Sequence, residues 1–301
     1  MSSLHPVPAL GSVLVTGAEG HIARGLLGAL AGHGNTLWST TRRPAHVGPR
    51  CLYLDLDKDL GAWPLPSDDI DVVFLCAAVS PMDRCGIEPE LTHRVNVTHT
   101  VELAKRFVAR GAFVVFLSTA LVLGGDTPYA RIDDPYKASV AYVMQKAEAE
   151  RDLLALGDRV AIVRMGKVIV PDMPLFNGWI DAFRAGETIH PFNNLVMAPI
   201  SLDFTVDVLC RVAAARRGGI VHATAAHDIS YARAADIIAR RIGVHDPSVA
   251  PVAGRFSPHV AVPRYAALDT TSLEALGLSA PMPEAAFDCL GRELPQVNPM
   301  S

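Results

Sequence analysis

The stretch SVLVTGAEGHIA, residues 12–23, decides the fold. It opens with a short apolar run of strand type, and the residues from position 21 onward have the spacing of a helix. Gly17 permits a tight turn between the two, and Gly20 lets the backbone approach a pyrophosphate, which the first amides of the helix would face. A plain connecting loop is the alternative, but this position in the chain favours a dinucleotide site. The residues expected to contact the dinucleotide here are Gly17, Glu19, Gly20, His21 and Ile22.

Apolar runs of strand length alternate with helix-length segments beyond this motif. The later runs are CLYLDL (51–56), DVVFLCAA (71–78), FVVFLST (113–119) and RVAIVRM (159–165), with helices expected near 88–110 and 136–156. Strands that are apolar on both faces are typical of a buried parallel sheet. The sequence therefore predicts an α/β fold of Rossmann type with a doubly wound parallel sheet.

The pattern changes after Pro171, where prolines and glycines become frequent. Helical segments are expected near 174–186, 203–215 and 230–242. We expect residues 1–170 to form the dinucleotide-binding domain and residues 171–301 to form mainly a small substrate-binding lobe, with a segment at about 200–225 returning to the core.

Composition narrows the classes of protein. The 301 residues are 50% hydrophobic and carry a net charge of −4 with both signs mixed, which disfavours disorder and a nucleic-acid partner. Five scattered cysteines without C-x-x-C spacing indicate reduced thiols, and the eleven histidines show no metal-binding motif. With no signal peptide at the N-terminus and no apolar stretch approaching 18 residues, neither secretion nor a membrane span is expected, and the cytoplasm is the expected location.

Two motifs carry a family resemblance. Thr16 before the glycine loop, with Ala23 as its third small residue, resembles the T-G-x-x-G-x-x-G of extended short-chain dehydrogenases/reductases. Tyr142 and Lys146 in YVMQK (142–146) resemble the Y-x-x-x-K of the same family. The resemblance covers nearly the whole chain, and it implies an enzyme that uses a nicotinamide dinucleotide.

The choice of dinucleotide depends on the end of the second strand. Members of the family that prefer NAD place Asp or Glu there, whereas this chain has Thr41 followed by Arg42 and Arg43. Without a carboxylate to repel a 2′-phosphate, and with two guanidinium groups able to bind it, NADP(H) is favoured over NAD(H).

The resemblance implies further contacts with the cofactor. Asp55 and its neighbour Leu56 match the residues beside the adenine, and Ala77 and Ala78 match the small residues that end the fourth strand. Asn96 matches the asparagine of the following helix, which in the family helps to order the sheet and an active-site water.

The same resemblance implies the catalytic residues. Thr119 ends the fifth strand as the catalytic hydroxyl, with Ser118 on the opposite face of the strand. Tyr142 is the expected acid, and a lysine ammonium one helical turn away would lower its pKa. Lys146 would also bind the nicotinamide ribose. Tyr136 has no lysine four residues later and is not expected to act.

Finer features resemble dTDP-4-dehydrorhamnose reductases. Ala120 and Leu121 replace the acidic pair of nucleotide-sugar dehydratases, while Pro199 and the segment VPRYAALD (262–269) match the reductases. The resemblance implies an NADPH-dependent reductase of a keto group on a nucleotide-activated sugar, in particular a 4-keto-6-deoxy sugar. An NAD(P)-dependent 4-epimerase and a non-catalytic regulatory protein of the same fold are the alternatives.

Some positions depart from the family or have no assigned partner. Lys167 and Val168 replace the Asn-Pro or Asn-Val that usually follows the VR strand, in a segment that normally touches nicotinamide and substrate. A homodimer through the helix of Tyr142 is common in the family, and the apolar residues of VAYVM (140–144) fit either such an interface or a helix face packed on the sheet. The candidates for contact with a substrate diphosphate are Arg184, Arg255 and Arg264.

Overall fold

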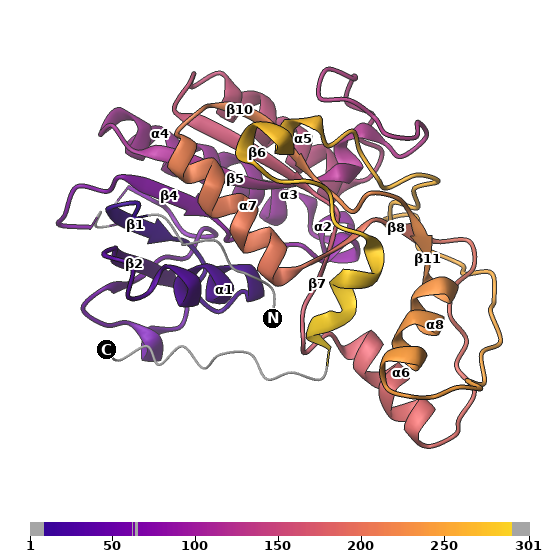
Figure 1. Ribbon diagram of the computed structural model, residues 1–301. Coiled ribbons are helices and arrows are strands. Elements are labelled where there is room, and N and C mark those ends of the chain that lie inside the picture. Colours follow the sequence, from indigo (N-terminus) through magenta and orange to yellow (C-terminus); the bar gives the residue numbers. More distant parts are fainter. Residues whose placement is uncertain (1–8, 62, 64–65, 291–301) are drawn as a thin grey trace.

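A parallel sheet forms the centre of the computed structural model, which describes residues 9–61, 63 and 66–290 (Figure 1). The strand order β10-β6-β5-β4-β1-β2-β3 reverses between β1 and β4, which is the point where doubly wound sheets bind ligands at the carboxyl ends of their strands. The predicted Rossmann-type fold is confirmed. The strands of this sheet are β1 (Ser12–Val15), β2 (Thr36–Thr41), β3 (Cys51–Tyr53), β4 (Val72–Leu75), β5 (Phe113–Thr119), β6 (Val160–Met165) and β10 (Gly219–Ala223).

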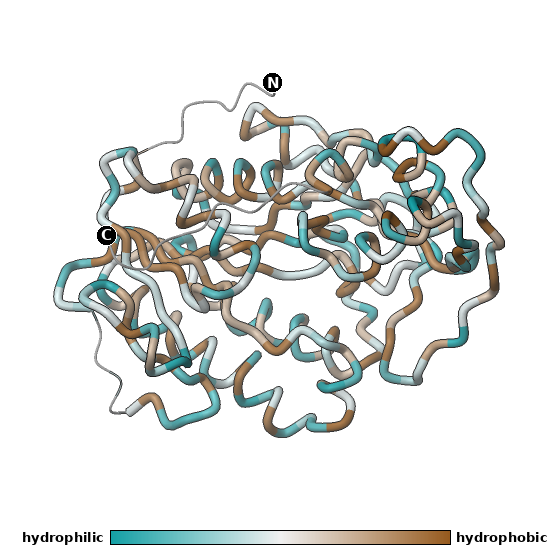
Figure 2. The backbone as a smooth tube through the Cα atoms, turned by 90° about the horizontal axis from the view of Figure 1, so that it is seen from below, coloured by the Kyte–Doolittle hydropathy of each residue, from teal (hydrophilic) through white to brown (hydrophobic). Residues whose placement is uncertain are grey.

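Helices cover both faces of the sheet, and Figure 2 shows them on either side of a band of hydrophobic strands. On one face lie α1 (His21–Leu30) and α7 (Leu202–Ala215), and on the other lie α4 (Thr100–Ala109) and α5 (Ala141–Leu154). Val13 packs under the first pair of helices, while Leu14 packs under the second. Because successive side chains of a strand point to opposite faces, a sheet covered on both sides requires the continuous apolar runs seen in the sequence.

The helix expected near 88–110 is interrupted. It consists of α3 (Pro89–His93), a π-helical segment (Arg94–His99) and α4, preceded by α2 (Met82–Ile87). Likewise, the helix expected near 136–156 begins only at Ala141. The chain before it is held as a loop, because the amide of Lys137 donates to the carbonyl of Val122 at 2.9 Å.

A small lobe lies beside the sheet, at the lower right of Figure 1. Its core is aromatic, with Phe176 packed edge-on against Trp179 and Phe287. Its elements and the short strands next to them are α6 (Pro174–Arg184), α8 (Tyr231–Arg241), β7 (Lys167–Ile169), β8 (Val196–Met197), β9 (Pro199–Ser201) and β11 (Ile229–Ser230).

The chain returns from the lobe to the sheet through α7 and β10, and β10 pairs with β6. The domain boundary at residue 170 stays a prediction. Among the described residues, no helix has the length and apolar character to cross a membrane.

Candidate active site

The glycine loop touches the end of β4. Gly17 has a φ of 72°, and a Cβ there would lie 3.1 Å from the Cα of Ala77. The hydroxyl of Thr16 accepts hydrogen bonds from the amides of Cys76 at 2.9 Å and Ala77 at 3.0 Å. Only glycine fits a left-handed conformation at such a close approach, so Thr16 and Gly17 together hold the loop against the small residues that end β4.

The start of α1 is built to receive an anion. Gly20 is its N-cap residue and provides no side chain to accept from the first amides, which leaves them for another acceptor. His21 pairs with Asp172 at 3.2 Å, while Ile22 packs against the core. The loop therefore fits the pyrophosphate of a dinucleotide.

A carboxylate lies at the end of β2, where the sequence indicated none. The hydroxyl of Thr41 donates to the carboxylate of Glu19, and His46 Nδ1 lies 3.1 Å from the same oxygen. Burial alone would raise the pKa of Glu19, but the hydrogen bonds from Thr41 and His46, with the charge of Arg43, hold it below its usual range. Arg42 and Arg43 are exposed beside this group. Only the fold reveals the contact, because Glu19 lies in the glycine loop and Thr41 ends β2, 22 positions away.

The other predicted cofactor contacts lie around β4. Ala77 is half-buried and Ala78 is exposed after the end of the strand. Asn96 is buried in the π-helical segment, accepts from the amide of Val79 at 2.8 Å and donates to its carbonyl at 2.9 Å. It thereby fixes the backbone next to Ala78.

Asp55 and Leu56 follow β3. The carboxylate of Asp55 accepts from the amide of Asp57 at 3.1 Å, and the carbonyl of the buried Leu56 lies 2.7 Å from Nδ1 of His99. The second contact ties this segment to the π-helical segment that carries Asn96.

The end of β5 and the helix α5 bring the three predicted catalytic residues together. Thr119 is half-buried and its hydroxyl accepts from the amide of Leu121 at 3.3 Å. Tyr142 is half-buried and packs against the apolar cluster that contains Ala120, the residue after Thr119. The ammonium of the buried Lys146 donates to the carbonyl of Leu117 at 2.8 Å.

Burial, with a smaller effect from Cys85, raises the pKa of Tyr142 to about 12. The lowering of this pKa expected from the Lys146 ammonium in the catalytic complex stays a prediction. Burial lowers the pKa of Lys146 itself to about 8, and its hydrogen bond goes to a carbonyl of β5. Tyr142 therefore keeps its proton near neutral pH, as a proton donor must.

A buried polar network connects α5 to β5 and β6. Ser118, on the opposite face of β5 from Thr119 as expected, donates to the carboxylate of Glu150. That carboxylate also pairs with Arg164 at 2.9 Å and accepts from the hydroxyl of Tyr136 at 3.0 Å. Sequence reasoning set Tyr136 aside because it lacks a lysine partner, and it did not identify Arg164. Arg164 is the one charged residue in the apolar run of β6, and a charge in a buried strand indicates a buried partner.

The arginines proposed for a diphosphate are exposed. Arg184 lies on α6 with Asp181 at 3.9 Å, and Arg255 makes no contact that would assign it to a site in the described part of the chain. The backbone of Arg264 donates to the carbonyl of Gly125 at 3.0 Å, which places it beside the loop that follows Thr119.

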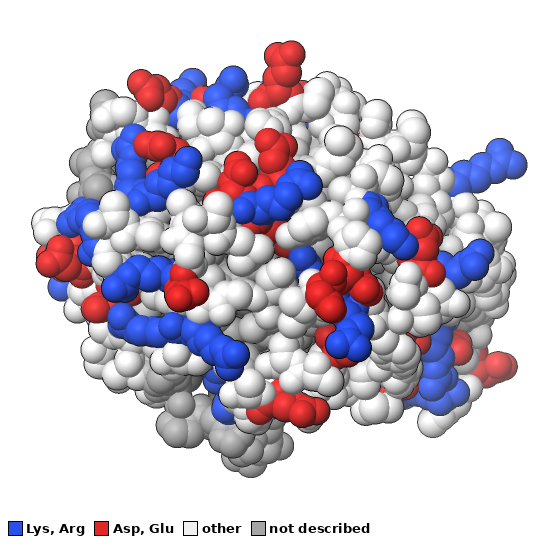
Figure 3. All heavy atoms as spheres, turned by 90° about the horizontal axis from the view of Figure 1, so that it is seen from above, with Lys and Arg blue, Asp and Glu red and all other residues white. Residues whose placement is uncertain are grey.

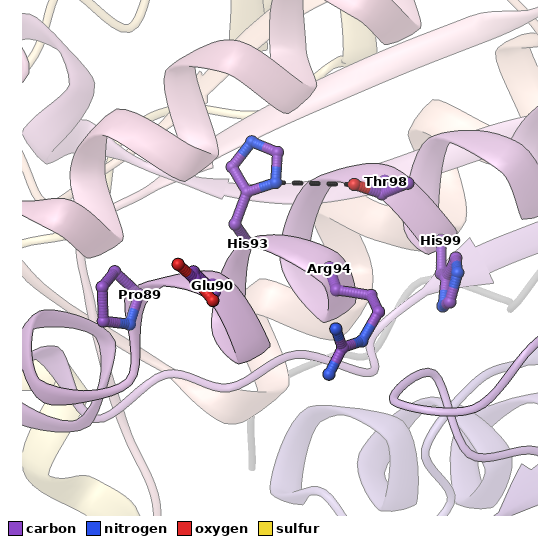
Figure 4. Close-up of a pocket in the computed structure, with 6 residues that line it drawn as sticks. All are labelled: Pro89, Glu90, His93, Arg94, Thr98 and His99. Atoms are coloured by element: carbon purple, nitrogen blue, oxygen red, sulfur yellow. Dashed lines mark hydrogen bonds between the residues drawn. The ribbon is translucent and has the colours of Figure 1, made fainter.

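The surface carries charges of both signs and a hollow. On the face shown in Figure 3, basic and acidic side chains are interspersed. Figure 4 shows a hollow of about 540 Å³ lined only by residues of α3 and the π-helical segment. Its Arg94 is paired with Asp57 and its His93 with Glu148. The hollow is separate from the residues predicted to act.

Relatives in sequence include proteins named as reductases and a protein named as a subunit of another enzyme. The chain is 28% identical to a dTDP-4-dehydrorhamnose reductase of Streptomyces griseus over 279 residues, 88% of each chain. It is 30% identical over 155 residues to a reductase of the same name from Mycolicibacterium smegmatis, and 30% identical over 118 residues to methionine adenosyltransferase 2 subunit beta of Xenopus tropicalis. These two matches cover 50% and 39% of this chain but only 44% and 35% of the relatives.

Solved structures share the fold. A dTDP-4-dehydrorhamnose reductase ortholog from Clostridium acetobutylicum superposes with a TM-score of 0.78 at 22% identity, covering 92% of this chain and 96% of the other. The reductase of Bacillus anthracis in complex with NADP has a TM-score of 0.77 at 18% identity, with 91% and 95% covered. MoeE5 in complex with UDP-glucose and NAD has a TM-score of 0.75 at 24% identity, with 92% and 96% covered.

The family model described as the RmlD substrate binding domain matches residues 11–287, which include the glycine loop, the end of β5 and α5. The chain belongs to this family, within the extended short-chain dehydrogenases/reductases.

Proposed function

We propose that the chain is an NADP(H)-dependent reductase of a keto group on a nucleotide-activated sugar, with a 4-keto-6-deoxy sugar as the expected substrate. The observation that carries the proposal is that α5, which bears Tyr142 and Lys146, lies against β5, the strand that ends at Thr119. The family and the relatives named as reductases support it.

The glycine loop, the end of β2 and Ala77 would hold the dinucleotide, which supplies a hydride to the carbonyl carbon of the substrate. The hydroxyl of Thr119 would bind the carbonyl oxygen and hold it against Tyr142. Because its pKa is raised, Tyr142 is protonated before the reaction. As negative charge grows on the carbonyl oxygen, Tyr142 donates its proton to that oxygen. The ammonium of Lys146 then stabilises the phenolate that remains.

The test is cofactor consumption. We expect the purified chain, mixed with NADPH and dTDP-4-keto-6-deoxyglucose, to oxidise one NADPH for each keto group reduced, as followed by the absorbance of NADPH. A 4-epimerase acts on a C4 hydroxyl and regenerates its nicotinamide, so inversion of C4 in UDP-glucose with a catalytic amount of NAD⁺, without reduction of the keto sugar, would favour the epimerase and refute the reductase.

The relatives named as subunit beta of a methionine adenosyltransferase favour a second candidate, a regulatory protein with the same fold. Such a protein would bind NADPH and consume none with any keto sugar. Both Tyr142 and Lys146 are retained in place at the end of β5, which supports the enzyme.

A homodimer through α5 stays a prediction. Val143 and Ala147 are buried within the chain, whereas Met144 is 55% exposed and is the apolar residue that this helix offers to a partner.

A further inference from the structure

Gln145 is a buried amide between the two residues of the Tyr142–Lys146 pattern. It is only 5% exposed, although an amide is costly to bury unless it is hydrogen-bonded. The pattern that predicts Tyr142 and Lys146 leaves this position without a role. The hydrogen-bond partners of Gln145 in the folded chain indicate why it is buried.

Both ends of the Gln145 amide are hydrogen-bonded to residues outside α5. Its Oε1 accepts from Nδ2 of Asn96 at 2.9 Å. Its Nε2 donates to the hydroxyl of Thr92 at 2.9 Å and to the carbonyl of Pro89 at 3.3 Å. Asn96 and Thr92 are themselves buried, and Pro89, labelled in Figure 4, begins α3. Gln145 therefore joins α5 to α3 and to the π-helical segment.

Asn96 connects Gln145 to the backbone that follows β4. The Asn96 side chain accepts from the amide of Val79 at 2.8 Å and donates to the carbonyl of the same residue at 2.9 Å. Together with the bond to Gln145, this uses both hydrogens of the Asn96 amide. Val79 directly follows Ala78, which is a predicted cofactor contact. A continuous series of hydrogen bonds thus runs from α5 to the segment expected to lie beside the dinucleotide.

The other buried polar residues of α5 bond in a different direction. Lys146 donates to the carbonyl of Leu117 in β5. Glu150 accepts from Ser118 of β5 and pairs with Arg164 of β6. These contacts hold α5 against β5 and β6, whereas Gln145 holds it toward the segment after β4.

We propose that Gln145 is a positioning residue, which sets the place of Tyr142 relative to the dinucleotide. Residues three apart are neighbours on the surface of a helix, so a shift of α5 at Gln145 moves Tyr142 as well. The inference rests on the proposed function, because it assumes that Tyr142 donates a proton to a carbonyl beside the nicotinamide. Proton transfer requires the two heavy atoms to lie about 3 Å apart, and a misplacement of about 1 Å can lower the rate about a hundredfold.

The test compares three variants. Gln145→Met removes both hydrogen-bonding groups at similar length, and Thr92→Val removes the hydroxyl that accepts from Gln145 at nearly constant volume. Thr205→Val is the control, because it removes a buried hydroxyl of α7 that donates to the carbonyl of Ser201 at 2.8 Å. The measurements are the single-turnover reduction of dTDP-4-keto-6-deoxyglucose by NADPH, the KM for the sugar, the dissociation constant of NADPH and the melting temperature.

We expect Gln145→Met to lower the single-turnover rate about ten- to a hundredfold, while KM and the dissociation constant of NADPH change by less than about threefold. Thr92→Val should lower the rate by a smaller factor, because Gln145 keeps its bond to Asn96. In the double variant the two losses should combine to less than their product, since both act through one amide. Thr205→Val should lower the melting temperature without loss of rate, which is the result that a merely structural residue gives.

Amide hydrogen exchange over residues 141–146 in the NADPH complex needs no turnover. Exchange should be faster in Gln145→Met than in the unaltered chain, and unchanged in Thr205→Val. Unchanged exchange in Gln145→Met, or reduction of the sugar at the rate of the unaltered chain, would overturn the inference. If Gln145→Met does not fold, Thr92→Val becomes the deciding variant, and an unchanged rate there overturns the inference.

Failure of the proposed function looks different. In that case the unaltered chain would leave NADPH unconsumed with the keto sugar, while the faster exchange of residues 141–146 in Gln145→Met would persist.

Discussion

Glu19 places a carboxylate at the end of β2, beside the arginines that are expected to bind a 2′-phosphate. The hydroxyl of Thr41 and the ring of His46 form hydrogen bonds with its carboxylate and lower its pKa, and the charge of Arg43 lowers the pKa further. This carboxylate works against the phosphate of NADPH and could accept hydrogen bonds from the ribose hydroxyls of NADH. At the scale of one residue, the choice of cofactor is a balance between Glu19 and the two arginines.

We therefore predict that Glu19→Gln increases the preference for NADPH over NADH by about two- to tenfold, the range expected for a partly exposed charge pair. Arg43→Ala, which removes a charge of the opposite sign at the same place, should lower that preference. Fluorescence titration with both cofactors measures the two dissociation constants. An unchanged ratio in Glu19→Gln would mean that the carboxylate does not face the cofactor.

At the scale of elements, a buried network ties α5 to three strands. Glu150 of α5 binds Ser118 of β5 and Arg164 of β6, and Arg164 reaches Nε2 of His222 in β10 at 3.3 Å. Nδ1 of His222 lies 2.8 Å from the carbonyl of Asp269, so this nitrogen carries the proton and Nε2 is the acceptor. Glu150 shares a face of α5 with Tyr142 and Lys146, so the network holds that face of the helix against β5.

This network makes stability depend on pH. Burial lowers the pKa of His222 to about 4, and the facing charge of Arg164 adds to the effect, whereas the hydrogen bond to the Asp269 carbonyl opposes it. In the unfolded chain, His222 binds a proton when the pH falls below about 6.5. In the folded chain, it binds that proton only when the pH falls to about 4. The stability that His222 contributes is thus present above this window and is lost as the pH falls through it.

We predict that the free energy of unfolding decreases as the pH is lowered from about 6.5 to about 4, with His222 contributing at most about 1.4 kcal/mol per pH unit. His222→Gln should remove this part of the slope, because a glutamine does not titrate. Urea unfolding of both proteins across this range gives the two slopes. Equal slopes would show that His222 does not stay neutral in the folded chain.

At the scale of the whole molecule, the sequence predicted the sheet and the order of its elements well. The glycine loop, the apolar runs and the Tyr142–Lys146 spacing are local signals, and a sheet covered on both faces needs the apolar runs. The interruption of the helix around Asn96 was not predictable, because it depends on hydrogen bonds to Val79, seventeen positions away. The burial that raises the pKa of Tyr142 and the contact of Lys146 with Leu117 were not predictable either, since both exist only in the folded chain.

In the proposed mechanism, the fold brings one proton donor, Tyr142, to the end of β5 beside a dinucleotide. The most direct measurement is the single-turnover reduction of a nucleotide 4-keto sugar by Tyr142→Phe, together with its affinity for NADPH. We predict that the rate falls by about a hundredfold to ten-thousandfold, as for loss of a general acid, while the dissociation constant of NADPH stays close to that of the unaltered chain. A Tyr142→Phe variant that reduces the sugar at the rate of the unaltered chain would contradict the account.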